Sequence, residues 1–144
     1  METTKRLEIS SALADLAGII LTMSGLFLPW GSMIYGYNEI LVPLNGLQAN
    51  YALTGIYAMI AFCIEIFGFF LLLAGTRKVA SAILMAAASF MILQTVMWLM
   101  SIRPVPFSYP IGHIENIGPY ATLIGSSFII FAALLSLLQL RLSS

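Results

Sequence analysis

Four long runs of apolar residues, separated by shorter polar segments, dominate the sequence. They cover residues at about 10–29, 51–75, 79–102 and 119–140. Each run is close to the ~20 residues that an α-helix needs to cross a hydrocarbon core of ~30 Å. None shows the alternation of apolar and polar residues that a transmembrane strand requires. Because lipid cannot satisfy backbone hydrogen bonds, the pattern predicts a single domain of four transmembrane helices.

The composition supports this prediction. Hydrophobic residues make up 60% of the chain and charged residues only 8%, whereas soluble domains usually carry about 25% charged residues. The expected solvent is therefore the lipid bilayer. The formal net charge is zero, so binding to nucleic acid is not expected. A signal peptide is the alternative interpretation of the first run, but Asp15 would interrupt its apolar region.

The basic residues indicate an orientation. If the helices alternate in direction, one side of the membrane receives every basic residue except Arg103; these are Lys5, Arg6, Arg77, Lys78 and Arg141. Positive residues favour the cytoplasmic side, which predicts a multi-pass plasma-membrane protein with both termini in the cytoplasm. The short segment 75–78 requires the second and third helices to be antiparallel neighbours.

Two loops are expected on the outer side. Residues 32–37 and 40–44 are rich in β-prone residues and predict a small hairpin, whereas residues 103–119 contain several prolines and glycines and predict an irregular loop. Aromatic side chains gather at this side, and the candidate outer cap consists of Trp30, Tyr35, Tyr37 and Tyr109. They are expected to form either an interfacial aromatic belt or a surface for a partner.

Small residues recur every seven positions along the predicted helices. The candidate packing seam consists of Gly18, Gly25, Ala61, Gly68 and Gly125, and Gly75 continues the spacing of the second helix. Small residues let membrane helices approach closely, and a seven-residue repeat favours left-handed packing. The fold class expected is an all-α, left-handed, antiparallel bundle of four transmembrane helices with a small β-prone outer loop. Some seams are alternatively expected to contact another subunit.

Asp15 and Glu65 are the candidate functional residues, because carboxylates inside membrane helices are costly. Both share a helix face with small residues. At 1.5 Å per residue they lie ~10 Å and ~15 Å from the cytoplasmic end, so their depths allow them to meet in the inner half of the bundle, although the sequence does not establish that they touch. If they meet, at least one is expected to be protonated. The alternatives are a structural hydrogen bond, snorkelling of Asp15 toward Lys5 and Arg6, contact with a cation of a partner subunit, and proton or ion traffic.

Other chemistry has little support in the sequence. His113 and Glu115, with Glu39, are weak candidates for a metal site, and a solvated loop histidine is the simpler interpretation. There is one cysteine, and there is no histidine pair for haem, no nucleotide-binding glycine loop and no nucleophile with a base. A non-enzymatic protein without a metal or cofactor is expected.

The layout resembles the claudin-like tetraspans. The features that carry the resemblance are the four spans, the β-prone first outer loop and Trp30-Gly31 directly after the first span. The resemblance implies a left-handed four-helix bundle that assembles laterally through its outer loops. This first loop is much shorter than in that family, and its paired cysteines and complete Trp…Gly-Leu-Trp…Cys…Cys motif are absent.

Two functional hypotheses remain. In the first, the chain is a non-enzymatic accessory subunit of a membrane complex, or a self-assembling tetraspan, that binds other membrane subunits or copies of itself through its seams and outer cap. In the second, it is a small proton- or cation-coupled transporter that uses Asp15 and Glu65. Loss of function on replacing both carboxylates favours transport, whereas damage from leucine at Gly18, Gly68 or Gly125 favours assembly.

Overall fold

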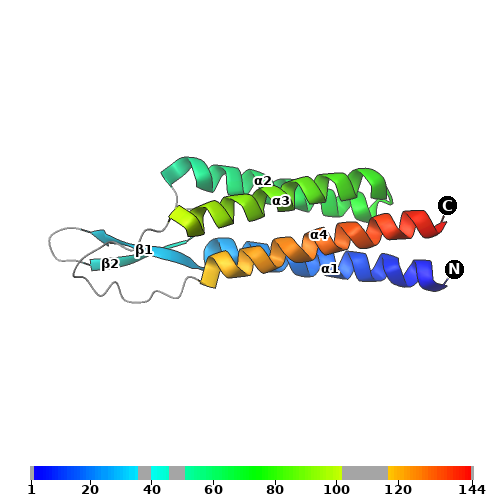
Figure 1. The fold of residues 1–144 in the computed structure, drawn as a ribbon, viewed down its shortest axis with the longest axis horizontal. Helices are drawn as coiled ribbons and strands as arrows, with labels where there is room; N and C mark the ends of the chain where they lie inside the picture. The colour runs from blue at the N-terminus through cyan, green and yellow to red at the C-terminus, as the bar shows by residue number, and fades with distance from the viewer. Residues whose placement is uncertain (1, 36–39, 46–50, 102–116, 144) are drawn as a thin grey trace.

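The computed structural model describes residues 2–35, 40–45, 51–101 and 117–143, which form four helices and one two-stranded sheet. The elements are α1 (Glu2–Phe27), β1 (Pro29–Tyr35), β2 (Ile40–Asn45), α2 (Tyr51–Leu73), α3 (Arg77–Ser101) and α4 (Ile117–Ser143). Figure 1 shows the helices side by side along one axis. Both chain termini lie at one end of this bundle, here called the termini end, and the strands extend from the other, the hairpin end.

Each helix is long and apolar enough to cross a membrane, over Thr3–Phe27, Ile56–Leu73, Arg77–Met100 and Ile117–Leu142. This confirms the predicted antiparallel bundle of four membrane spans. One boundary was wrong: the first helix begins at Glu2, well before residue 10. The polar residues before the apolar run are mostly good helix formers such as Glu, Lys, Arg and Leu, so the helix extends beyond the part that lipid requires.

The tight turn between α2 and α3 depends on Gly75, which has a positive φ of 85°. The Gly75 N–H donates to the Leu72 carbonyl and the Thr76 N–H donates to the Leu71 carbonyl, both at 3.1 Å. This pattern is the Schellman cap, which favours glycine because other residues resist a positive φ. The expectation that Gly75 continues the packing seam is wrong, since it is exposed and has no neighbour for an added Cβ within 4 Å.

The closest helix contact joins α1 to α4 through a shared pattern. Both helices carry Gly-x-x-x-Thr-x-x-Gly, and the contact consists of Gly18, Thr22 and Gly25 of α1 and Gly118, Thr122 and Gly125 of α4. A Cβ atom added to Gly18 would lie 2.7 Å from the Gly125 carbonyl oxygen, and one added to Gly125 would lie 2.7 Å from the Gly18 carbonyl oxygen. The corresponding distance between Gly25 and Gly118 is 2.8 Å in both directions. The two backbones therefore touch in antiparallel register, and only glycine fits.

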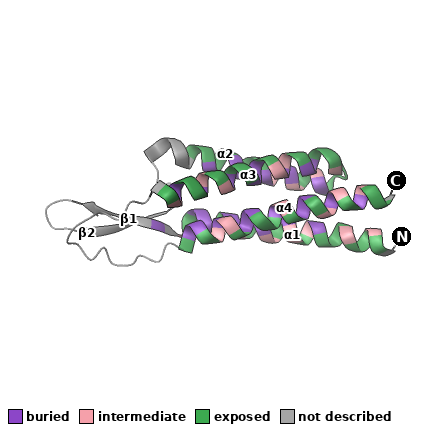
Figure 2. Cartoon of the chain, in the orientation of Figure 1, coloured by how far each residue is buried: buried purple, intermediate pink, exposed green. Residues whose placement is uncertain are grey.

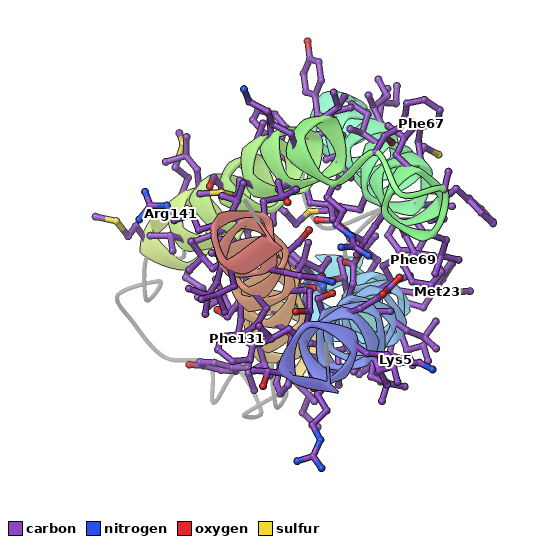
Figure 3. The ribbon with its side chains drawn as sticks, turned by 90° about the vertical axis from the view of Figure 1, so that its right-hand side faces the viewer. Lys5, Met23, Phe67, Phe69, Phe131 and Arg141 are labelled. Carbon is purple, nitrogen blue, oxygen red and sulfur yellow. The ribbon has the colours of Figure 1, made fainter. Side chains whose placement is uncertain are left out.

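Burial follows one face of each helix, as Figure 2 shows. The core includes Leu26, Leu84, Met91 and Ile129, each almost completely buried. Large apolar side chains such as those of Phe67, Phe70 and Phe131 are exposed on the outside, and Figure 3 shows Phe67 and Phe131 pointing away from the bundle. An apolar exterior over the whole length of the helices is the surface expected of a protein surrounded by lipid.

Strands β1 and β2 pair antiparallel, with Tyr35 opposite Ile40 and Gly31 opposite Leu44. The register shifts between Pro29 and Gly31, so Trp30 has no opposite residue. Such an irregularity changes the direction of a side chain. Here it accompanies the packing of Trp30 against the ends of the helices.

We predict that Gly125→Ala destabilises the bundle by about 1–3 kcal/mol, because the added methyl group meets backbone atoms of α1 that cannot rotate away. Unfolding in mixed detergent micelles measures this change. Ser127→Leu is the matched control on α4, since Ser127 is exposed and the substitution leaves the α1–α4 contact intact. Equal stability of Gly125→Ala and the wild type would contradict the proposed backbone contact.

Candidate functional site

Asp15 lies in the interior of the bundle. Its side chain is fully buried, and neither oxygen has a hydrogen-bond partner within the part of the chain that the structure describes. Gly18 lies three residues further along α1, on the same helix face. Because Gly18 must face α4 to make its backbone contact, Asp15 is held toward the interior as well.

Glu65 lies in the corresponding position on α2. It is fully buried, and its oxygens also have no hydrogen-bond partner among the described residues. Gly68, three residues later, packs against Leu84 of α3, where an added Cβ would lie 2.7 Å from a methyl carbon. Glu65 is close enough to Asp15 for the two charges to repel each other. The structure thus brings together the two carboxylates that the sequence singled out.

Asp15 does not reach the aqueous boundary. Lys5 is exposed, and Figure 3 shows its side chain pointing away from the interior. Asp15 itself is fully buried, and neither of its oxygens has a hydrogen-bond partner among the described residues. A charge on either carboxylate at this depth costs at least about 2.5 kcal/mol. Two such groups without a partner are a feature that folding alone does not explain.

Further polar side chains line the interior, and sequence reasoning missed most of them. Buried oxygens without a hydrogen-bond partner in the described ranges also belong to Thr22, Ser81, Ser126, Ser136 and Gln139. All five residues are at most 1% exposed. For Thr22 and Ser136 the available signal was their spacing of three or four residues from Gly18, Gly25 and Ala133, which places them on the inward face of their helices.

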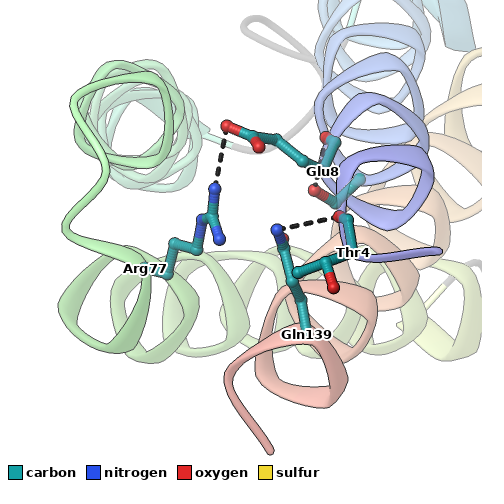
Figure 4. A network of polar contacts seen from close by, with 5 residues as sticks. Thr4, Glu8, Arg77 and Gln139 are labelled. Carbon is teal, nitrogen blue, oxygen red and sulfur yellow. Dashed lines mark hydrogen bonds and ion pairs between the residues drawn. The ribbon is translucent and has the colours of Figure 1, made fainter. Parts of the chain in front are cut away.

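Polar contacts connect three helices at the termini end, as Figure 4 shows. The Arg77 guanidinium lies 2.8 Å from the Glu8 carboxylate and joins α3 to α1. The Gln139 side-chain amide donates to the Thr4 carbonyl at 3.0 Å and joins α4 to α1. Ser11 donates to the Glu8 carbonyl at 2.9 Å. The two contacts between helices were not predicted, because they join residues far apart in the chain.

The Trp30 side chain is buried in the bundle interior at the hairpin end. Its indole N–H donates to the Gly25 carbonyl at 2.7 Å, and its ring meets Trp98 edge-on at 5.2 Å with an interplanar angle of 69°. Trp30 is 4% exposed, so its ring is not on the outer surface where the sequence analysis put it. Tyr35 ends β1, and Tyr37 and Tyr109 lie outside the described residues.

The seam residues lie at contacts within the chain. Gly18, Gly25 and Gly125 meet across the α1–α4 contact, and Ala61 and Gly68 are buried on the inward face of α2. A partner helix therefore cannot reach Gly18, Gly25 or Gly125 in this fold, whereas Ala61 also lines an apolar hollow between α2 and α3.

No group of three or more His, Cys, Asp and Glu side chains suited to a metal ion occurs among the described residues. The weak metal candidates His113, Glu115 and Glu39 lie outside them.

We predict that Trp30→Phe lowers the stability of the protein by about 0.5–1.5 kcal/mol, because the ring remains but the hydrogen bond to Gly25 is lost. Trp30→Ala should cost about 3–5 kcal/mol, because it also removes the packing against Trp98. Unfolding in mixed micelles measures both variants. If Trp30→Ala is as stable as the wild type, Trp30 does not close the hairpin end.

Comparison with known protein families, curated proteins and solved structures finds no match for this chain. The similarity to claudin-like tetraspans is therefore limited to the layout of four spans and identifies no family. Sequence and structure together show a multi-pass membrane protein that is an antiparallel bundle of four spanning helices.

Proposed function

We propose that this protein is a small proton- or cation-coupled transporter in which Asp15 and Glu65 form the ion-binding site. The observation that supports the proposal is the position of the two carboxylates. They come from different helices, they are completely buried and mutually close, and neither has a hydrogen-bond partner in the described part of the chain. Carboxylates retained inside a membrane despite their cost usually belong to an ion or proton pathway.

The geometry argues against the competing interpretations of the carboxylates. If the carboxylates had only a structural role, each would be expected to accept a hydrogen bond from a neighbouring donor, because an unsatisfied buried acceptor is destabilising. A partner's cation would have to approach from lipid, yet both residues have no exposed surface. An ion-binding site has neither problem, because the proton or cation itself neutralises the pair.

The chemistry of the pair is simple. One proton on either Asp15 or Glu65 leaves a single negative charge, and a second proton or a monovalent cation makes the site neutral. Releasing that second proton or cation returns the site to a single negative charge. The site thus has two charge states. In the proposed transport step, the change between them alters how α1 packs against α2. These two helices pack least closely of the sequential helix pairs.

We retain three further proposals from the sequence. The distribution of lysine and arginine supports a cytoplasmic termini end in the plasma membrane. The seven-residue spacing of small residues supports a left-handed bundle. The protein is proposed to be non-enzymatic and to need no cofactor, because the sequence offers no nucleophile with a base and no cofactor motif.

We predict that the purified protein in liposomes carries protons or a monovalent cation down an imposed gradient, and that the variant with both Asp15→Asn and Glu65→Gln does not. The two amides preserve shape but cannot bind a proton or cation as the carboxylates do. A fluorescent pH indicator and a potassium or sodium indicator inside the vesicles measure the flux. Glu2→Gln, at the first residue of α1, is the matched carboxylate control and should transport normally. Full flux in the double variant would refute the proposal.

A second function, assembly with another membrane subunit or a second copy, is favoured by one observation on α3. Its lipid-facing side carries a stripe of small residues, Ala82, Ala86 and Ser89, all of them exposed. Beside it, a shallow apolar hollow of about 390 Å³ runs between α2 and α3, with Ala86 and Phe90 in its wall. Unlike the glycines of α1 and α4, this stripe is not covered by another helix of the chain, and small residues of this kind favour helix association.

If assembly is the function, Ala86→Leu should abolish co-purification of other membrane subunits or of a second copy, because the larger side chain separates the helices. Native mass spectrometry after mild detergent extraction measures the assembly state. Ser24→Leu, on the exposed side of α1, should leave it unchanged. A wild-type protein that emerges alone with lipid would contradict the assembly hypothesis.

A further inference from the structure

The two ends of the bundle differ in the side chains that lie between the outside and the two carboxylates. Toward the termini end, Ser81, Ser136 and the Gln139 side-chain oxygen join the two carboxylates as buried groups without a hydrogen-bond partner in the described ranges. Each of the four helices contributes at least one such residue. Unsatisfied polar groups on all sides of one interior region are unusual, because folded proteins normally pair them.

The hairpin end is closed by packing. Thr95 donates to the Met91 carbonyl at 2.8 Å, and Thr122 donates to the Gly118 carbonyl at 3.0 Å, whereas Thr22 and Ser126 have no hydrogen-bond partner among the described residues. The backbones of α1 and α4 touch at the glycine-threonine contact. Leu26, Met91 and the paired rings of Trp30 and Trp98 are buried at this end. Among the described residues, large apolar side chains therefore lie between the outside and the polar groups at this end.

We infer that protons or monovalent cations reach Asp15 and Glu65 from the termini end, along a polar tract formed by Ser81, Ser136 and Gln139, whose mouth is closed by the Glu8–Arg77 ion pair. The inference rests on the proposed function, because it describes access to the same carboxylate site. It adds the direction of access, the residues that line the route and a gate.

These residues lie at successive depths from the termini end of the bundle. At 1.5 Å per residue, Gln139 and Ser81 lie ~6 Å from the nearer ends of α4 and α3, Ser136 lies ~10 Å from the end of α4, and Glu65 lies ~12 Å from the end of α2. Asp15 lies seven residues, or ~10 Å, beyond Glu8 along α1. The Gln139 amide donates to the Thr4 carbonyl, one helical turn toward the termini from Glu8. A cation or proton entering at the termini end would thus meet the Gln139 amide oxygen first and the serine hydroxyls before the carboxylates.

The ion pair at the mouth joins the two halves of the bundle. Arg77 begins α3 directly after the turn from α2, and it reaches across to Glu8 on α1, as Figure 4 shows. The Arg77 side chain is 19% exposed and that of Glu8 is 56% exposed. Such a pair contributes little to stability, so it can open at low cost.

The side chains that line the inferred route determine which kind of ion can use it. Hydroxyl, amide and carboxylate oxygens are the ligands that hard cations and hydrated protons prefer, and the carboxylates repel anions. The route therefore favours protons or small cations over organic anions or apolar molecules.

Thiol accessibility in lipid nanodiscs tests this route, because both faces of the membrane are then open to the reagent. In a Cys63→Ala background, Ser81→Cys and Ser136→Cys should react about tenfold faster with a small cationic thiosulfonate than Thr95→Cys does, because reaction requires access to water. Thr95 is the matched control, since it is buried on α3 at a similar depth from the opposite end. Adding Glu8→Gln should raise the rate at both serine positions several-fold.

Equal rates at all three positions, or faster reaction at Thr95→Cys, would overturn the inferred route. Carboxylate-dependent flux without labelling at Ser81→Cys or Ser136→Cys would overturn the route but leave the proposed function standing. Labelling at both positions in a protein without carboxylate-dependent flux would overturn the proposed function but not the water-accessible tract. The two failures are therefore distinguishable.

Discussion

The backbone contact between α1 and α4 constrains the rest of this structure. Glycines that face each other at Gly18–Gly125 and Gly25–Gly118 fix the rotation of both helices about their axes, because any other face would bring side chains into the contact. Asp15 lies less than one helical turn from Gly18 and must turn inward with it. In lipid, where apolar side chains gain nothing by leaving the solvent, such close packing provides much of the available association energy.

A similar constraint acts on α2. Gly68 packs against Leu84, and Glu65 follows it into the interior. The tight turn at Gly75 holds α3 beside α2, and α3 packs in turn against α4, which packs against α1. The two carboxylates come from α1 and α2, the sequential helices that pack least closely. The location of the proposed ion site thus follows from glycine contacts that have no chemical role themselves.

The coarse fold could be predicted from the sequence, because four apolar runs in lipid have few alternatives to four antiparallel helices. The inward position of Asp15 and Glu65 was also indicated by their spacing from Gly18 and Gly68. The role of Trp30 could not be predicted, since an aromatic residue at a span boundary usually belongs to the interfacial belt. Its burial depends on the register shift in β1 and on Trp98, which is distant in the sequence.

Other features were visible in the sequence but were misinterpreted. The shared Gly-x-x-x-Thr-x-x-Gly pattern of α1 and α4 was seen only as a heptad of small residues, so its pairing across the bundle was missed. Gly75 matched the heptad of α2, yet its position before Thr76-Arg77 is that of a helix cap. The contact between Glu8 and Arg77 joins residues that are far apart in the sequence and requires the tertiary fold.

The most direct test of an exchangeable carboxylate pair is infrared difference spectroscopy of the protein in lipid. Spectra recorded between acidic and alkaline buffer, or with and without sodium or potassium, report the carbonyl stretch of protonated carboxyl groups. The structure predicts a difference band in the wild type that disappears in the variant with both Asp15→Asn and Glu65→Gln. A spectrum without such a band, or a band that persists in the double variant, would contradict the assignment of Asp15 and Glu65 as the ion-binding site.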